Sequence, residues 1–545
     1  MSVNNYKPME NLVSRAGTKK NESTTTNAIV SSGQETIAAV STASGMGGIG
    51  IVRLSGDSAE EILTNLFAET QGIRGQGEQG DRRPVPLSCV PLSPVFEDRR
   101  MRHGWIVDPV SNETIDEVLC VLMRAPHSYT GEDVAEIQCH GGPIPLRRIL
   151  GAAYAFGAVP AEPGEFTKRA FLNGRLDLVQ AGAVIDLINS RTDLSYRAAS
   201  ELAAGRLSAQ IREARELLLE VLAEIAARID YPEAYEHEVK IQPFIDSTEP
   251  SWNDALTSPL RAADKILHDL LDGADRGKLV RDGMRVSIIG RPNVGKSSLY
   301  NAMLRTDAAI VAEEPGTTRD TLETWLDLGG ATVALTDTAG IRKDAGAVEQ
   351  AGIRRAHEAY DRADVCLFVL DGSAPISEED RQIARSLRED KPTILVVNKN
   401  DLQTQLSDED AFDLVPSAIA LVRTTLTGQR DTGQRDRPSV LPEQDRRPVP
   451  LSCLAELESL LYGLVTGGKM AAEQNFLVTR EAHKAALENA STEIGAGLMC
   501  IAADDPPEFV EISVREAYRI LGEIIGEEVT DEVINRVFEG FCVGK

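Results

Sequence analysis

Residues Gly290 to Ser297 spell GRPNVGKS, the glycine-rich pattern of a loop that wraps nucleotide phosphates. An apolar segment, Val286 to Ile289, precedes this loop, and a helix-compatible segment, Ser298 to Leu304, follows it. In a strand, loop and helix of this order, the loop N–H groups and the positive end of the helix dipole face the phosphates. Lys296 is expected to reach the outer phosphates and Ser297 to bind magnesium. The chain is therefore predicted to contain an α/β nucleotide-binding domain.

A second motif, Asn398 to Asp401, indicates which base the site binds. It follows the apolar run Thr393 to Val397, at the carboxyl end of a predicted strand, where α/β sheets bind ligands. The Asp401 carboxylate can accept hydrogen bonds from N1–H and the 2-amino group of guanine. Adenine lacks that donor pair and would leave the carboxylate unpaired. The predicted nucleotide is therefore GTP.

The segment between these motifs supplies candidates for magnesium binding. Asp337 to Gly340 spell DTAG, and they follow an apolar run. Asp337 is expected to hold the magnesium shell, and the N–H of Gly340 is expected to meet the γ-phosphate. Thr318, in the polar stretch PGTTRD, is the expected magnesium ligand beside Ser297.

Apolar runs also outline the domains. Four short runs around the nucleotide motifs, several of them alternating with helical segments, predict a mostly parallel sheet covered by helices. Short runs separated by glycines predict a strand-rich N-terminal domain. Apolar residues three, four or seven apart between Leu207 and Ile229 predict a long helix with one apolar face. The apolar runs predicted to be strands are Thr36–Val40, Gly47–Leu54, Glu117–Met123, Val134–Ile137, Arg285–Ile289, Ala331–Thr336, Val365–Leu370 and Thr393–Val397. Further helical patterns occur at Glu481–Ala503 and Val514–Phe541.

At 545 residues the chain is long enough for about two to four domains, and the fold class is predicted to be multidomain α+β. The two helical regions form either one domain interrupted by the GTPase module or two separate bundles. On the first interpretation, the parts are a disordered tail (1–34), an N-terminal domain (35–160), a helical domain (161–282 and 465–545) and a GTPase domain (283–464).

Two exposed insertions are expected, at about 71–99 and 424–447. The nonapeptide DRRPVPLSC occurs at 81–89 and again at 445–453, and TGQRD is repeated within 427–436. Identical residues in unrelated contexts are typical of low-complexity inserts. Disordered loops are therefore predicted at both places.

The composition excludes several classes of protein. A formal charge of −27 argues against a broad cationic surface for nucleic acid. No stretch approaches the ~20 consecutive apolar residues of a membrane-spanning helix, and the N-terminus has no apolar signal core. The seven cysteines are dispersed, which fits a reducing cytosol and does not suggest a zinc site. A cytoplasmic protein without a membrane partner is expected.

The order of the nucleotide motifs resembles that of GTPases related to Era, and flanking segments narrow the match. These segments are SYTGEDV at 128–134, HGG at 140–142, PGEFTKRAFLN at 163–173 and FCVGK at 541–545. Together they look like the MnmE (TrmE) family of tRNA modification GTPases. The resemblance covers nearly everything from Glu35 onward apart from the two inserts.

The resemblance implies a homodimer whose N-terminal domain dimerises and binds 5-formyl-tetrahydrofolate or a related folate. A discontinuous helical domain carries the inserted GTPase domain in this family. With an MnmG-type flavoprotein in a heterotetramer, the family forms 5-carboxymethylaminomethyluridine, or its aminomethyl relative, at the wobble position of tRNA. FAD enters only through the partner.

The residue after the DTAG motif is Ile341, where Ras-like enzymes carry a glutamine that orients water. The resemblance implies that potassium supplies positive charge at this site and that two GTPase domains close face to face. Glu349 matches the family glutamate that positions water, and it is the predicted catalytic residue. The potassium ligands implied by the resemblance are Asn293, Ala312, Glu314 and Thr317.

A last loop of the family contacts guanine through a Ser-Ala pair, and two candidates exist here. Ser417-Ala418 is one. Ser452-Cys453 is favoured, because the helix-like segment Leu454 to Leu461 follows it. The residues expected to contact GTP are Gly290, Asn293, Val294, Gly295, Lys296, Ser297, Ser298, Ala312, Glu313, Glu314, Pro315, Gly316, Thr317, Thr318, Asp337, Thr338, Ala339, Gly340, Asn398, Lys399, Asp401, Ser452 and Cys453.

The resemblance also implies folate-binding residues, namely Arg53, Glu136, Arg175 and Lys545. Polar groups of these types can satisfy the pterin amides and the glutamyl carboxylate of a folate. Cys542 is a candidate functional thiol close to the folate site in the family; a reactive thiol and a packed one both fit the sequence.

Two other functions are alternatives to tRNA modification. A regulatory GTPase of the Era-like group, acting in ribosome assembly, would need an RNA-binding module after the GTPase domain, whereas this chain continues with an acidic helical segment. A folate-dependent transferase acting alone would form product without the flavoprotein. The leading prediction is the GTP-hydrolysing component of a tRNA wobble-uridine modification system.

Overall fold

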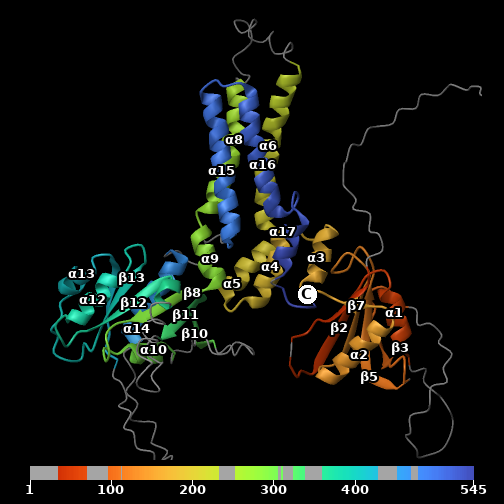
Figure 1. Ribbon diagram of the computed structural model, residues 1–545, viewed down its shortest axis with the longest axis horizontal. Helices are drawn as coiled ribbons and strands as arrows, with labels where there is room; N and C mark the ends of the chain where they lie inside the picture. The colour runs from red at the N-terminus through yellow and green to blue at the C-terminus, as the bar shows by residue number, and fades with distance from the viewer. Residues whose placement is uncertain are drawn as a thin grey trace, which may run out of the picture. The chain divides into compact units, whose positions relative to one another are not determined.

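The computed structural model describes residues 35–43, 45–69, 96–111, 113–231, 252–304, 309–310, 323–337, 359–426, 451–467, 477–539 and 541–544. The chain divides into two compact units, residues 1–124 with 133–160 and residues 125–132 with 161–545. Figure 1 labels the helices and strands of both units. The predicted tail at 1–34 lies outside the described residues.

The first unit is a seven-stranded sheet with two helices. The strand order is β3-β4-β5-β6-β2-β1-β7, and the pairs are antiparallel except for β1 with β7. Buried side chains of α1 and α2 share one core with alternate residues of the strands, so the helices cover one face of the sheet. The elements are β1 (Ile37–Val40), β2 (Ile49–Ser55), α1 (Ala59–Leu66), β3 (Phe67–Ala68), β4 (Arg102–Val107), β5 (Thr114–Met123), β6 (Val134–His140), α2 (Pro143–Ala155) and β7 (Val159–Pro160).

The strand-rich character predicted for this region is confirmed, but the predicted insertion at 71–99 ends too late. Phe96 is 1% exposed, and its ring lies 5.3 Å from the ring of Phe67 in an edge-to-face contact. Arg99 donates its backbone N–H to the carbonyl of Leu122. Residues 96–99 therefore belong to the folded unit. The buried ring of Phe96 stabilises this unit through the hydrophobic effect and through its contact with Phe67.

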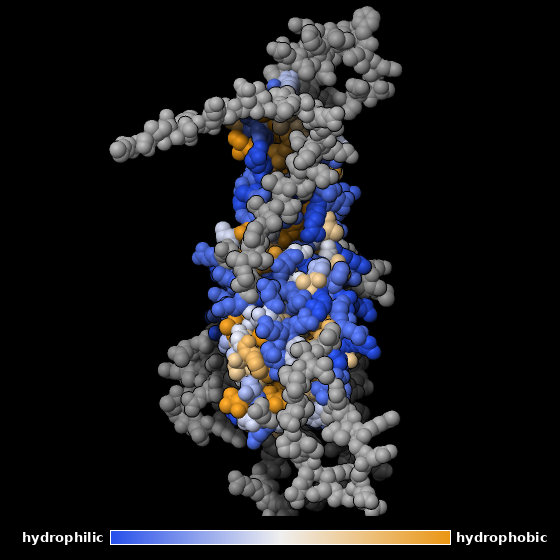
Figure 2. Space-filling model, turned by 90° about the vertical axis from the view of Figure 1, so that its right-hand side faces the viewer, coloured by the Kyte–Doolittle hydropathy of each residue, from blue (hydrophilic) through white to orange (hydrophobic). Residues whose placement is uncertain are grey.

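The helical part of the second unit is a bundle of long helices (Figure 1). Its core combines buried residues of α6 and α8, which precede the GTPase module in the sequence, with those of α15 and α16, which follow it. The helices are α3 (Glu165–Leu172), α4 (Leu178–Asn189), α5 (Asp193–Ala203), α6 (Arg206–Asp230), α8 (Trp252–Leu271), α9 (Ala274–Asp282), α15 (Glu481–Ala502), α16 (Pro507–Ile525) and α17 (Asp531–Phe538). On the face shown in Figure 2, most of the described surface is hydrophilic, with hydrophobic residues visible along the bundle.

The predicted helical segment Val514 to Phe541 contains parts of two helices in the structure. The helix α16 begins earlier, at Pro507, and ends where Gly526 adopts a positive φ of 85°. The N–H groups of Gly526 and Glu527 both bond to the carbonyl of Gly522, which terminates the helix in a left-handed cap. A separate helix, α17, then follows.

The GTPase part contains a second seven-stranded sheet, with the order β14-β13-β12-β8-β11-β10-β9. β14, β13, β12, β8 and β11 are parallel, and β10 runs antiparallel to its two neighbours. α12 and α13 pack on one face, and α10 and α14 pack on the other. The elements are β8 (Met284–Ile289), α10 (Lys296–Leu304), β9 (Ala309–Ile310), β10 (Glu323–Leu328), β11 (Ala331–Asp337), β12 (Val365–Asp371), α12 (Glu378–Ser386), β13 (Thr393–Asn398), α13 (Asp408–Leu414), β14 (Ala418–Arg423) and α14 (Leu451–Thr466).

Two helices join the bundle to the GTPase sheet. In α5, Leu194 packs into the GTPase core, whereas Leu202 packs into the bundle core. In α9, Val280 packs into the GTPase core and Ala274 packs into the bundle core. The two cores are thus continuous through α5 and α9, and α9 leads through a single residue into β8 and its phosphate loop.

Within the described ranges, no helix is both long and apolar enough to cross a lipid bilayer. The predicted loops at the duplicated nonapeptide mostly lie outside the described residues. The last three residues of its second copy are an exception, because α14 begins at Leu451. A disordered loop extending to Cys453 was therefore a wrong prediction.

Candidate guanine nucleotide site

The predicted nucleotide motifs gather at one edge of the GTPase sheet. Because the central strands are parallel, their carboxyl ends meet there. The strand register pairs Asp337 with Ile288 and Asp371 with Asn398. The phosphate loop leaves β8 at this edge, directly after Ile289.

The phosphate loop requires its glycines because it is crowded by neighbouring strands. Gly290 has a φ of 147°, and a Cβ placed there would lie 2.4 Å from the carbonyl oxygen of Val369. Gly295 has a φ of 105°, and its Cβ would lie 2.0 Å from Asn398 Nδ2. Neither position accepts a side chain without displacing backbone or the guanine motif. Asn293 also has a positive φ, of 66°, which asparagine tolerates better than most residues.

Lys296 and Ser297, the residues predicted to bind phosphate and magnesium, lie at the start of α10, directly after the phosphate loop. Lys296 is the first residue of α10, and its Nζ donates to the carbonyls of Gly290 and Arg291, both at 2.8 Å. The ammonium therefore lies over the loop. Ser297 is exposed on the first turn of the same helix, and Ser298 is half-buried. A helix N-terminus of this kind favours anions through its dipole and the direction of its N–H groups.

Asn398 connects the guanine motif to the phosphate loop. Its side chain is 1% exposed, and Nδ2 donates to the carbonyl of Val294 at 2.9 Å. Its Oδ1 accepts from Thr424 Oγ1 and from the N–H of Leu426, each at 3.2 Å. Asp401 follows in a turn and is exposed, so its carboxylate is accessible to a base. These contacts fix the Asn398 motif against the phosphate loop and against the segment after β14.

The two candidates for the predicted serine loop lie in other surroundings than the sequence predicted. Ser417 lies just before β14 begins, at the opposite edge of the sheet from the phosphate loop. Ser452 and Cys453 lie in the first turn of α14 and not in a loop before it. Contact of Ser452 and Cys453 with guanine stays a prediction.

Sequence reasoning missed Thr424, which follows β14 at the nucleotide edge. Thr424 is fully buried, donates its N–H to Val397 and bonds to Asn398 through its hydroxyl. The predicted insertion at 424–447 therefore begins too early, since Leu426 is also buried. Recognising β14 as a strand would have revealed this residue, because the loop after it must lie beside the Asn398 motif.

Several predicted site residues lie outside the described residues. Asp337 ends β11 at the same edge of the sheet as the phosphate loop, and its magnesium role stays a prediction. The potassium, magnesium and catalytic assignments, including those of Asn293 and Ser297, stay predictions. The predicted residues outside the described ranges are Ala312, Glu313, Glu314, Pro315, Gly316, Thr317, Thr318, Thr338, Ala339, Gly340, Glu349 and Lys545.

Two of the residues predicted to bind folate face each other in the first unit. Arg53 on β2 is directly opposite Glu136 on β6. Arg53 Nε donates to Glu136 Oε1 at 2.9 Å, and Nη2 lies 2.8 Å from the same oxygen. The two side chains are 15% and 17% exposed, so the pair is partly shielded and can still meet a ligand.

The second unit carries two other residues of the folate prediction. The guanidinium of Arg175 donates to the carbonyl of Tyr129 and lies 5.1 Å from the centroid of its ring. Cys542 is exposed and not part of a disulfide, and its carbonyl accepts from the N–H of Gly164 at 3.3 Å. Arg175 is therefore held by both a hydrogen bond and a cation–π contact.

Comparison with known proteins places these features in a family. The model of the MnmE helical domain matches residues 178–542, and the model described as the GTP-binding protein TrmE N-terminus matches residues 36–175. The tRNA modification GTPase MnmE of Natranaerobius thermophilus is 37% identical over 512 residues, which cover 94% of this chain and 100% of the relative. The protein of the same name from Geobacillus kaustophilus is 40% identical over 511 residues, with 94% and 99% covered. A crystal structure of Era with MgGDPNP and nucleotides of 16S ribosomal RNA aligns with 26% identity over 26% of this chain and 51% of that one, at a TM-score of 0.21.

Proposed function

Because this chain belongs to the MnmE family of tRNA modification GTPases, we propose that it hydrolyses GTP in the service of tRNA wobble-uridine modification. The observation that carries the proposal is the buried Asn398 amide, which ties the phosphate loop to the guanine motif. The product is 5-carboxymethylaminomethyluridine or its aminomethyl relative. The nucleotide is bound with Mg²⁺ through Ser297 and Thr318.

The modification requires partners. We assign the chain to a cytoplasmic homodimer that acts with an MnmG-type flavoprotein, which holds the FAD. A folate supplies the one-carbon unit, and Arg53, Glu136, Arg175 and Lys545 bind it. The ion pair between Arg53 and Glu136 supports this assignment, since a guanidinium and a carboxylate present donors and acceptors that match a pterin amide.

GTP hydrolysis depends on potassium in this proposal. Ile341 cannot orient water, and the family resemblance implies that a bound potassium ion supplies positive charge beside the phosphates. Asn293 supports the assignment, because it is exposed on the phosphate loop with its backbone in the left-handed region. Ala312, Glu314 and Thr317 complete the potassium site, and Glu349 positions the attacking water.

One experiment tests the GTPase mechanism. GTP hydrolysis is measured in KCl and in NaCl, and the distance between spectroscopic labels on the two GTPase domains of the dimer is followed with GDP and aluminium fluoride in each salt. Stimulation by potassium, with GTPase-domain pairing only in KCl, is the expected result. Equal rates in both salts and no pairing would contradict the mechanism. Formation of modified tRNA without the flavoprotein would contradict the assigned partner.

A further inference from the structure

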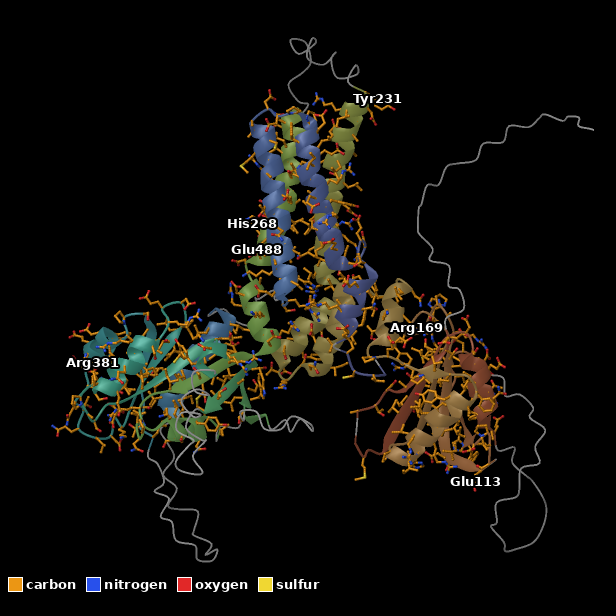
Figure 3. All side chains as sticks on the ribbon, in the orientation of Figure 1. Glu113, Arg169, Tyr231, His268, Arg381 and Glu488 are labelled. Atoms are coloured by element: carbon orange, nitrogen blue, oxygen red, sulfur yellow. The ribbon has the colours of Figure 1, made fainter. Side chains whose placement is uncertain are left out.

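Four charged side chains form a cluster that links the phosphate loop to the guanine motif. Asp371 ends β12, Asp380 lies in the first turn of α12, Arg291 belongs to the phosphate loop, and Lys399 belongs to the guanine motif. The helix α12 is located in Figure 3 by its labelled residue Arg381. The two carboxylates are 10% and 3% exposed, so each requires a nearby cation.

Asp371 is the centre of this group. Lys399 Nζ donates to its Oδ2 at 2.6 Å, and Arg291 Nη2 lies 3.6 Å from the same oxygen. The N–H and the hydroxyl of Ser373 both donate to Oδ1, at 3.1 and 2.6 Å. Burial alone would raise the pKa of Asp371, but Lys399 and Ser373 hold that pKa below its ordinary value. The carboxylate is therefore charged at neutral pH and binds both nucleotide motifs.

On the guanine side, Asp371 holds a backbone conformation that costs energy. Lys399 has a φ of 64°, in the left-handed region that a lysine rarely adopts. The neighbouring Gly372 reinforces the arrangement, because it donates to the carbonyl of Asn398 and accepts from the N–H of Gln405, both at 2.8 Å. The loop from 399 to 405 is thus fixed to the end of β12 at both of its ends. Asp401 lies within this loop.

On the phosphate side, Arg291 connects the loop to a buried carboxylate. Its Nε lies 3.3 Å from Asp380 Oδ2, which also accepts from the N–H and hydroxyl of Ser377 at the start of α12. The other oxygen of Asp380 is buried without a hydrogen-bond partner. Arg291 therefore compensates two carboxylates, and its position sets where the phosphate loop lies relative to β12 and α12.

We propose that Asp371 is a positioning residue for guanine selection, which holds Asp401 at the correct place relative to the phosphate loop. This inference rests on the proposed GTP binding and extends it to a residue outside the nucleotide motifs. Asp371 acts through Lys399 and Arg291, and its loss should affect recognition of the base more than the hydrolysis step.

The test compares Asp371→Asn with the wild-type protein in binding GTP and inosine triphosphate. Inosine triphosphate keeps N1–H but lacks the 2-amino group, so a correctly placed Asp401 forms one fewer hydrogen bond with it. We expect the Kd for GTP to rise about ten- to hundredfold, since a charge-assisted contact that positions the loop is lost. The Kd for inosine triphosphate should rise less, so the preference for GTP falls. The kcat at saturating GTP should stay within about twofold of the wild-type value.

Other variants separate positioning from general damage. Asp390→Asn removes an exposed ion pair with Arg388 in the same domain and should leave both Kd values unchanged. Ser373→Ala removes the hydroxyl that donates to Oδ1 of Asp371 but keeps the charge of the carboxylate. It should therefore lower the preference for GTP by a smaller factor than Asp371→Asn does. It also serves if Asp371→Asn does not fold.

The outcomes are distinguishable from a failure of the proposed function. If the wild-type protein does not prefer GTP over ATP, the proposed function fails. If it does prefer GTP over ATP, but Asp371→Asn and Ser373→Ala weaken the binding of GTP and of inosine triphosphate by equal factors, Asp371 is merely structural and the inference is overturned.

Discussion

The side-chain amide of Asn398 donates to the carbonyl of Val294 at 2.9 Å, which joins two motifs 104 residues apart. Its Oδ1 at the same time accepts hydrogen bonds from the hydroxyl of Thr424 and from the N–H of Leu426. The guanine motif and the phosphate loop are consequently one structural unit, and binding of base and phosphates is coupled through a buried side chain.

Asn398→Ala should abolish this coupling. Three polar groups would lose their partner, at about 1–3 kcal/mol for each one left buried and unsatisfied. We expect at least ~100-fold weaker GTP binding, measured by titration with a fluorescent GTP analogue, together with a lower melting temperature. Asn400→Ala, an exposed neighbour in the same loop, is the matched control and should bind GTP nearly as well as the wild-type protein. Equal affinities for the two variants would contradict the coupling.

Glu349→Ala should separate binding from hydrolysis. If Glu349 positions the attacking water, its removal leaves the contacts to GTP intact and lowers kcat at least ~100-fold. Equilibrium binding of a non-hydrolysable GTP analogue and the rate of phosphate release in KCl provide the two readouts. Unchanged turnover would rule out Glu349 as the catalytic residue.

Glu136→Gln should weaken folate binding without much loss of stability. The substitution keeps the shape of the side chain but removes the charge that orients Arg53. Titration calorimetry with 5-formyl-tetrahydrofolate should give about tenfold weaker binding, because charge-assisted hydrogen bonds contribute roughly 1.5–3 kcal/mol. Glu117→Gln changes an exposed pair with His103 on the same sheet and should leave the affinity unchanged. A normal affinity in Glu136→Gln would exclude this pair from the folate site.

His483 should make the stability of the second unit dependent on pH. Its Nδ1 is buried without a hydrogen-bond partner, and burial followed by the nearby Arg480 lowers its pKa from 6.5 to about 4, with Arg281 adding to this effect and Asp186 opposing it. The unfolded chain therefore takes up a proton below pH 6.5 that the folded protein accepts only near pH 4. Stability falls as the pH drops through this window, by about 2 kcal/mol between pH 7 and pH 5, and levels off below about pH 4.

Urea unfolding at pH 7 and pH 5 measures this effect. His483→Gln should lose less stability than the wild-type protein over this range. His268→Gln, at an exposed position on α8, should lose as much as the wild-type protein. Identical losses in all three proteins would contradict the role of His483.

Gly283→Ala should destabilise the link between α9 and the phosphate strand. Gly283 has a φ of 77°, and a Cβ there would lie 2.6 Å from the Trp325 ring, which also carries Arg191 on its face at 4.2 Å. Backbone strain and this clash together predict a loss of about 2 kcal/mol, seen as a lower melting temperature. Gly463→Ala lies in α14 with open space around it and should be neutral or stabilising by up to about 1 kcal/mol. A destabilised Gly463 variant or an unaffected Gly283 variant would overturn this account.

The sequence by itself determined the features that depend on local order along the chain. The phosphate loop is predictable because its glycines, Lys296 and Ser297 occupy consecutive positions between a strand and a helix. Asn398 to Asp401 are predictable in the same way, since a motif at the end of a buried strand must lie at the sheet edge. The long helix α6 follows from its apolar spacing, within a residue or two at each end.

Only the tertiary structure decided the features that depend on contacts between distant segments. Thr424 became part of the site through its bond to Asn398, and Phe96 joined a core across a long segment. The helices α15 and α16 share a core with α6 and α8, although more than 200 residues separate α8 from α15. Local periodicity records which face of a segment is buried, but it carries no information about which partner covers that face. Asp371 shows the same division, because its role follows from two cations that the fold brings to one carboxylate.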